Sequence, residues 1–384
     1  MSNLDGGMPS GLAQGGSKFE NINYYNGGLR ISIPMLKVGG RGDAGFTIPL
    51  KVNNRSYIVN GSLGTGPYGA HYWNWDVINS HNYGDTYNPQ PDYGPGRMTA
   101  DFSGDGLTQE SSGPRWFYSA VGVRLTFSAP DGTQYNFYSQ KSFGGPLTSG
   151  VYDNWLDFGT VFISEQSTQI TFISDAPLAT GPGELPNGTI QGWGWMYLPN
   201  GTRYRIEDSL VKKSIDRNGN QITYTYDSAG RVLTITDPLN RQVQFAYGQN
   251  LGAQGTCDVI TFPGFGGTPR TILVTRTNLS GALVSGSQVV WSDLTQVAKT
   301  MWLPDGRKYE FRYTPNGEVA RIVLPTGGGF EYDYAAGVVG GPSNGLIGPY
   351  NVHIFGTAPQ QMPGVYRRLV TRRDYKDISS GVYE

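Results

Sequence analysis

The sequence repeats itself across residues 303–334, and this repetition limits the chain to folds built from stacked copies of one small unit. Residues of the first half recur 21 positions later in the second half, so that position 305 corresponds to position 326. The matched pairs are Asp305 and Thr326, Gly306 and Gly327, Phe311 and Tyr332, and Tyr313 and Tyr334. Such a period is typical of repeat proteins, in which one unit cannot bury its apolar face without its neighbours.

The unit is predicted to consist of two strands joined by tight turns. Residues 308–313 (KYEFRY) alternate charged with aromatic side chains, which is the two-residue period of a strand with one aromatic face. The TPNG sequence that follows suits a turn, and residues 319–324 are mostly apolar and β-branched, as expected of a return strand. We therefore expect an all-β fold, an antiparallel sheet of repeats in which aromatic residues line one surface: Phe311, Tyr313, Tyr332 and Tyr334.

The composition favours a folded chain without a strongly charged partner. Aromatic residues make up 13% of the 384 residues and argue against disorder, although Gly (56) and Pro (24) are abundant. The formal net charge of -1 gives no field that would recruit nucleic acid or an anionic membrane. Cys257 is the single cysteine, so an intrachain disulfide is excluded. Residues 1–18 lack the features of a signal peptide, and no apolar run predicts a membrane span.

Changes in pattern along the chain predict four regions. Residues 1–20 are rich in Gly and Ser and are expected to form a flexible lead-in. Residues 21–120 are predicted as an N-terminal β region that contains an irregular segment at 64–116. The repeat array is expected over 121–335, with insertions at about 141–190 and 249–288. Residues 336–384 are expected to be loosely ordered, with one strand near 367–377, and to be truncated.

The most regular copy lies at residues 215–248 and carries a recognisable motif. Aromatic and β-branched positions of one strand recur 21 positions later (222 to 243): Ile222, Tyr224 and Tyr226 are matched by Val243, Phe245 and Tyr247. Between them stands YDSAGR, in which Asp227 can accept backbone N–H groups, Gly230 completes a turn and Arg231 opens the return strand. This motif resembles the YD repeat of the RHS family, which includes bacterial RHS toxins, the shells of insecticidal toxin complexes and the teneurins. Residues 27–50 also resemble the region with which many bacterial RHS proteins begin.

The resemblance implies a β-sheet that spirals into a hollow shell, which in the polymorphic toxins of the family encloses a C-terminal effector. It implies a secreted or cell-surface location and, as partners, the remainder of the shell and an effector. No core segment or effector is recognisable before Glu384. We therefore expect the N-terminal part of such a protein, with a non-catalytic scaffold role.

Motifs of catalysis and cofactor binding are weak. Cys257 with one of His71, His81 and His353 is a conceivable nucleophile pair, but QGTCDVITF favours a small buried residue at a strand start. GTGPYG at 64–69 matches a dinucleotide-binding pattern, yet its proline deletes a backbone donor and no helix follows, so a loop is expected. The sequence thus predicts no enzyme and no cofactor.

One metal hypothesis rests on DFSGDG. Asp101, Ser103 and Asp105 place oxygen atoms at alternate positions before a glycine, as in a calcium loop, but Ser112 stands where the loop needs a glutamate. An Asp-rich turn explains the same residues.

Two aromatic clusters suggest the alternative function of a carbohydrate or cell-surface binding module. Aromatic side chains on one face of a strand can stack on sugar rings, but they can equally form the wall of a core. The clusters comprise Trp73 and Trp75 in HYWNWD, and Trp193, Trp195 and Tyr197 in QGWGWMY.

Overall fold

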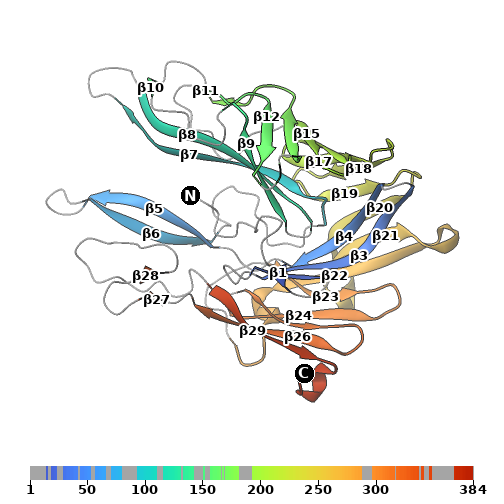
Figure 1. Cartoon of the computed structure of the whole chain (residues 1–384). Coiled ribbons are helices and arrows are strands. Elements are labelled where there is room, and N and C mark those ends of the chain that lie inside the picture. The colour runs from blue at the N-terminus through green and yellow to red at the C-terminus, as the bar shows by residue number, and fades with distance from the viewer. Residues whose placement is uncertain are drawn as a thin grey trace.

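A computed structural model of the chain is shown in Figure 1. It describes residues 14–15, 19–23, 29–41, 44–52, 57–65, 71–79, 93–109, 116–130, 133–141, 150–151, 156–165, 167, 169–180, 193–287, 296–315, 317–336, 339–340, 346–347 and 367–383. These residues form β-strands, turns and short 3-10 segments, and none of them lies in an α-helix. The all-β prediction is confirmed.

One antiparallel sheet of 19 strands dominates the molecule. Its strands before the most regular repeat are β7 (Arg97–Gln109), β8 (Trp116–Ser128), β9 (Gln134–Ser139), β10 (Gly150–Val151), β12 (Val161–Ser164), β13 (Thr171–Ser174), β15 (Gly194–Tyr197) and β16 (Arg203–Glu207). The strands that follow are β17 (Leu210–Ile215), β18 (Gln221–Tyr226), β19 (Val232–Thr236), β20 (Gln242–Asn250), β21 (Thr256–Pro263), β22 (Pro269–Asn278), β23 (Gln296–Trp302), β24 (Lys308–Tyr313), β25 (Val319–Val323), β26 (Gly329–Ala336) and β29 (Arg367–Tyr375). Four 3-10 segments adjoin them: η2 (Gly252–Gln254), η3 (Phe265–Gly267), η4 (Leu279–Ala282) and η5 (Ile378–Ser380).

The remaining strands form smaller sheets. A four-stranded sheet consists of β1 (Gln14–Gly15), β2 (Glu20–Asn23), β3 (Leu29–Arg41) and β4 (Ala44–Val52). Three two-stranded pairs are β5 (Tyr57–Thr65) with β6 (His71–Asn79), β11 (Leu156–Asp157) with β14 (Ala179–Thr180), and β27 (Val339–Gly340) with β28 (Leu346–Ile347).

The large sheet is a meander that curves back on itself at one end. From β15 to β26 each strand pairs with the next in the chain, and β26 pairs with β29. At the other end the order continues from β15 through β13, β12, β9 and β8 to β7. Leu210 of β17 pairs with Arg97 of β7, so eight strands close into a ring of pairings. In Figure 1 the sheet follows an arc from β7 and β8 at the top to β26 and β29 at the bottom.

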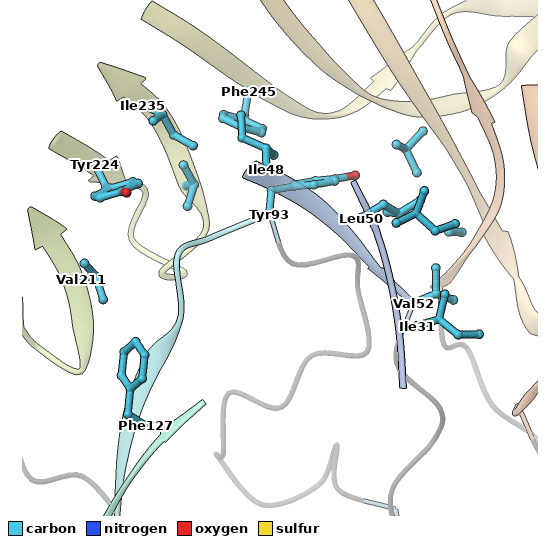
Figure 2. Close-up of a cluster of buried hydrophobic side chains, with 14 of the residues drawn as sticks. Ile31, Ile48, Leu50, Val52, Tyr93, Phe127, Val211, Tyr224, Ile235 and Phe245 are labelled. Atoms are coloured by element: carbon cyan, nitrogen blue, oxygen red, sulfur yellow. The ribbon is translucent and has the colours of Figure 1, made fainter. Parts of the chain in front are cut away.

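Alternation along each strand gives the sheet an apolar inner face. In β18, Ile222 and Tyr224 are buried whereas Thr223 and Thr225 are not, because successive side chains point to opposite faces. Figure 2 shows side chains of β4, β18, β19 and β20 directed into one cluster. Tyr93 stacks there on Phe245, with ring centroids 5.5 Å apart.

The four-stranded N-terminal sheet supplies the second layer of this core. β3 and β4 lie within the arc (Figure 1), and their inward residues are fully buried: Ile31, Ile33, Ile48, Leu50 and Val52. Phe46 contacts Tyr224 of β18 edge to face at 5.7 Å. At the far end the buried carboxylate of Glu20 accepts two hydrogen bonds from Arg372 of β29, at 2.9 and 3.0 Å. The inner face of the array is therefore covered by the chain's own beginning.

Four segments differ from the expected organisation. The stretches predicted as insertions, 141–190 and 249–288, contribute β12, β13, β21 and β22 to the large sheet. In β21 and β22 the inward positions are filled by aliphatic residues, such as Ile260, Ile272 and Val274, so the second stretch lacks the aromatic pattern. The stretch predicted as irregular, 64–116, contains β6 and β7. The last residue of the stretch predicted as a flexible lead-in, Glu20, is instead buried and ion-paired.

We expect Leu50→Ala to lower the free energy of unfolding by about 2–5 kcal/mol, because it leaves a cavity between the two layers. Leu50 is 0% exposed. Lys37→Ala, at an exposed position of β3, is the control and should change stability by less than about 0.5 kcal/mol. Urea unfolding followed by tryptophan fluorescence measures both. Equal midpoints for the two variants would mean that the N-terminal sheet does not stabilise the array.

Candidate functional site

Seven of the described hairpin turns of the array share one backbone geometry. In each of the seven, the first residue donates its N–H to the carbonyl of the fifth, and the fourth donates to the carbonyl of the first. The fourth residue has φ between 60° and 91°, which favours Gly or Asn. These residues are Gly201, Gly219, Gly230, Asn240, Gly306, Gly317 and Gly327. Gly219 and Asn240 are 21 positions apart, as are Gly306 and Gly327, so the spacing of the turns follows the predicted period.

An aspartate holds several of these turns closed. The Asp227 Oδ1 atom accepts hydrogen bonds from the N–H groups of Ala229 (3.0 Å) and Arg231 (2.8 Å). Its Oδ2 atom accepts from Nε of Arg231 at 2.8 Å. Asp237 binds Leu239 and Arg241 in the same way, at 2.9, 2.9 and 2.7 Å. We call this arrangement the aspartate clasp.

The clasp changes the acidity of its carboxyl group. Partial burial of Asp227 acts to raise its pKa, but hydrogen bonds from the backbone and guanidinium of Arg231 outweigh this effect. The pKa of Asp227 therefore lies below its usual value. A hydrogen bond from the Arg307 side chain likewise lowers the pKa of Asp305.

A tyrosine in each of β18, β20, β24 and β26 fastens its strand to the preceding strand. Each of four tyrosine hydroxyls donates to the backbone carbonyl of the residue 15 positions earlier, at 2.6–2.8 Å. The donors and acceptors are Tyr226 and Val211, Tyr247 and Val232, Tyr313 and Ala298, and Tyr334 and Val319. We call these bonds the tyrosine clasps.

The accepting carbonyls occupy equivalent places beside β-bulges. Cross-strand register shifts by one residue just after each acceptor. The extra residues are Lys212, Leu233, Lys299 and Ala320. A bulge interrupts the regular ladder of backbone hydrogen bonds. The tyrosine hydroxyl thus supplies a partner at the point where the ladder is irregular.

The two clasps are connected through Arg231. The guanidinium of Arg231, held by Asp227, lies over the ring of Tyr247 with its Cζ atom 4.5 Å from the centroid. Tyr247 in turn binds the carbonyl of Val232, the residue after Arg231. The fold therefore joins Asp227, Arg231 and Tyr247 of the sequence motif into one contact set, with Gly230 providing the positive φ of the turn.

The second predicted set is also placed in hairpins of the array. Phe311, Tyr313 and Tyr332 are buried on the inner face, and Tyr334 is half-buried. Asp305 and Gly306 form a turn in which Asp305 accepts from the N–H and Nε of Arg307, at 3.1 and 2.8 Å. Sequence reasoning missed the clasp at Asp237, although the spacing from Asp237 to Arg241 matches that from Asp227 to Arg231.

A buried polar cluster lies among the apolar residues of the inner face. Asp258 accepts hydrogen bonds from the Tyr93 hydroxyl and the Gly248 N–H, both at 3.1 Å, and pairs with Arg276 at 3.2 Å. The Asp258 and Arg276 side chains are only 2% and 7% exposed. Burial raises the pKa of Asp258 despite the neighbouring guanidinium. Sequence reasoning missed this cluster, because its members are far apart in the chain.

The predicted metal and nucleophile residues are only partly described. Asp101, Ser103 and Asp105 lie in β7, so the expected loop is instead an extended strand whose backbone pairs with β8. Their side chains, and those of the three histidines, lie outside the described residues. Cys257 is buried near the start of β21. Within the described part of the chain, no cluster of three His, Cys, Asp or Glu residues could hold a metal ion.

The two aromatic clusters lie in different sheets. Trp73 and Trp75 belong to β6, and their side chains lie outside the described residues. Trp193, Trp195 and Tyr197 point outward from β15, opposite to the buried Met196. Trp193 is 44% exposed. The Cζ atoms of Arg203 and Arg205 lie 5.3 and 5.6 Å from the centroid of the Trp195 ring.

A curved sheet of clasped antiparallel hairpins defines a structural repeat protein. Residues 208–248 match the family model of the RHS repeat, and this segment spans β17–β20 with the tyrosine clasps of Tyr226 and Tyr247. This match over residues 208–248 agrees with the predicted RHS family. No curated protein matches the chain. No helix among the described residues is long and apolar enough to cross a membrane.

We expect Tyr313→Phe to lower the free energy of unfolding by about 1–3 kcal/mol, because the buried carbonyl of Ala298 loses its donor. Tyr309→Phe is the matched control in the same strand. The Tyr309 hydroxyl has no hydrogen-bond partner among the described residues, and its loss should cost less than about 0.5 kcal/mol. Chemical denaturation measures both variants, and similar losses in the two would contradict a role for the clasp.

The stabilising effect of Asp227 should depend on pH. At pH 7, Asp227→Asn keeps the acceptor for backbone N–H groups but loses the charge-assisted bond to Arg231, so we expect a loss of about 0.5–1 kcal/mol. Because the folded-state pKa is lowered, the contribution is present above the unfolded-state pKa of about 4 and disappears as pH falls through the folded-state value. The measurement is urea unfolding from pH 7 to pH 3.

Asp208→Asn serves as the control for this pH dependence. Asp208 is exposed and forms no ion pair in the described part of the chain. Its substitution should leave the pH profile of the free energy of unfolding unchanged. A difference between wild type and Asp227→Asn that stays constant down to pH 3 would refute the ionic clasp.

Proposed function

We propose that the chain is a non-catalytic scaffold segment of a secreted or cell-surface RHS-type protein. In the longer protein it contributes to a β shell that encloses a C-terminal effector. The observation that carries this proposal is the continuous pairing of strands from β7 to β29, in which four hairpins carry a tyrosine clasp. RHS repeats are structural, and proteins that carry them are typically extracellular or on the cell surface.

The shape of the sheet supports an enclosing role. Its strands curve in an arc (Figure 1). Its buried apolar residues form one core cluster together with those of β3 and β4, which lie within that arc. Within the segment, the N-terminal sheet covers part of this inner face. Further hairpins added beyond β29 would prolong the arc, because each hairpin contacts mainly its neighbours. The remainder of the shell and the effector are the partners of this proposal.

A second candidate function is a carbohydrate or cell-surface binding module. The exposed indole of Trp193 on the outer face favours it, since a solvent-facing aromatic ring beside other aromatic residues offers a stacking surface. This function is compatible with the first, because the shell uses the inner face and sugar binding would use the outer one.

The scaffold proposal is tested on the protein as its host makes it. An antibody raised against residues 193–287 should detect a polypeptide in the extracellular or surface fraction that is longer than this chain. Protease should leave its C-terminal part intact until denaturant opens the sheet. An intracellular polypeptide that ends at Glu384, or one whose C-terminal part is cleaved as readily as an unfolded chain, would refute the proposal.

A further inference from the structure

The guanidinium group of Arg276 is buried with fewer acceptors than its hydrogen atoms require. Its Nη2 atom lies 3.2 Å from Oδ1 of Asp258, and the Arg276 side chain is only 7% exposed. The Nε and Nη1 atoms are buried and have no hydrogen-bond partner within the described part of the chain. A buried donor without an acceptor is unfavourable, and a charged one most of all. The site therefore calls for an acceptor that the described residues do not supply.

The charge of Arg276 is also less completely matched than that of another paired arginine in this chain. Asp175 accepts two parallel hydrogen bonds from Arg205, at 2.8 and 2.6 Å. Asp258 makes a single, longer contact with Arg276, and its other hydrogen bonds come from the Tyr93 hydroxyl and a backbone N–H. The carboxylate of Asp258 is thus shared among three donors and leaves two sides of the guanidinium free.

A β-bulge in β20 brings the backbone close to this guanidinium. Tyr247 and Gly248 of β20 both face Asp258 of β21, because the register shifts there by one residue. Gly248 has a φ of 64°, and a Cβ atom on it would lie 3.9 Å from Nη2 of Arg276. Any longer side chain at this position would extend beside the guanidinium. Glycine therefore keeps the space next to Arg276 open.

The charges around Asp258 favour an anion as the missing acceptor. Burial raises the pKa of this carboxyl group, although the neighbouring guanidinium opposes the effect. Once the carboxyl group takes up a proton, the positive charge of Arg276 has no negative partner among the described residues, and an anion restores neutrality. The titratable groups that face Asp258 or lie next to it are Tyr93, Arg231, Tyr247, Cys257 and Arg276.

We propose that Arg276 forms the centre of a buried site for a small monovalent anion such as chloride, which accepts hydrogen bonds from the free N–H groups and binds more tightly when Asp258 is protonated. The ligand must be small, because the chain encloses the guanidinium almost completely. A water molecule is the competing occupant, since it can accept the same hydrogen bonds but brings no charge. This inference goes beyond the scaffold function and does not depend on it.

The first test measures the melting temperature of the full chain in chloride and in gluconate, an anion too large for an enclosed site, at equal ionic strength. Chloride should raise the melting temperature in proportion to the logarithm of its concentration above the dissociation constant, whereas gluconate should not. The sign of the pH effect follows from the raised pKa of Asp258: stabilisation by chloride should be larger at about pH 5 than at about pH 7. Equal melting temperatures in the two salts at both pH values would overturn the proposal.

Two substitutions separate the anion from general salt effects. Asp258→Asn removes the competing negative charge but keeps an oxygen acceptor, so chloride should bind about tenfold more tightly at pH 7 and lose its pH dependence. Arg276→Gln should abolish the chloride effect. Arg270→Gln, an exposed arginine on the same strand β22, is the matched control and should respond like the wild type. Chloride affinity that is unchanged in Asp258→Asn would contradict the proposed coupling.

Crystals of the wild-type chain grown in bromide test the location without any substitution. Bromide replaces chloride and is identified by its anomalous scattering. We expect an anomalous peak within hydrogen-bonding distance of Nε or Nη1 of Arg276. A water molecule there, without anomalous signal, would overturn the anion site even if Arg276→Gln failed to fold.

Discussion

The tyrosine clasp is the interaction on which the regularity of this array depends. A β-bulge at the start of a return strand lets the sheet bend, but it also breaks the ladder of backbone hydrogen bonds. In the four clasped hairpins a hydroxyl from the following strand binds the carbonyl beside the bulge, at nearly constant distance and with the same 15-residue separation. The bulge therefore supplies the curvature and the tyrosine hydroxyl of the next strand supplies the missing hydrogen bond, which an aromatic side chain without a hydroxyl could not do.

Each clasp joins a strand to the hairpin before it, so the array can be extended without altering what precedes it. The aspartate clasps act within single turns, between residues no more than four positions apart. Stability in such an architecture is close to a sum over units and their neighbours. The buried pair of Asp258 and Arg276 is different, because it gains hydrogen bonds from Tyr93 and Gly248, which belong to other parts of the chain. It specifies where the segment containing Tyr93 packs on the array.

What the sequence reveals about this fold is its local chemistry. The period, the alternation of Lys308 to Tyr313 and the turn at Asp227 are properties of short stretches, and they are sufficient to predict strands, turns and family. The acceptors of the tyrosine clasps are backbone carbonyls, which every residue has. The side chains at the acceptor positions therefore do not reveal the bonds; these positions are Val211, Val232, Ala298 and Val319. The packing of Leu50 against the array, and the pairing of Glu20 with Arg372, depend on contacts between distant residues and leave no pattern in either segment.

The two faces of the sheet are subject to different physical demands, because the inner face packs against a second layer and the outer face does not. On the inner face every position must fill space next to a second layer, so an aromatic residue there, such as Phe311, is explained by packing alone. The outer face has no such demand in β18–β20, where most outward positions hold threonine or glutamine and Leu233 is 37% exposed. Trp193 and Trp195 on that outer face are therefore not explained by the repeat. Trp195 contacts Arg203 and Arg205, whereas Trp193 is 44% exposed, so the exposed indole of Trp193 is the part of this surface that packing within the chain explains least.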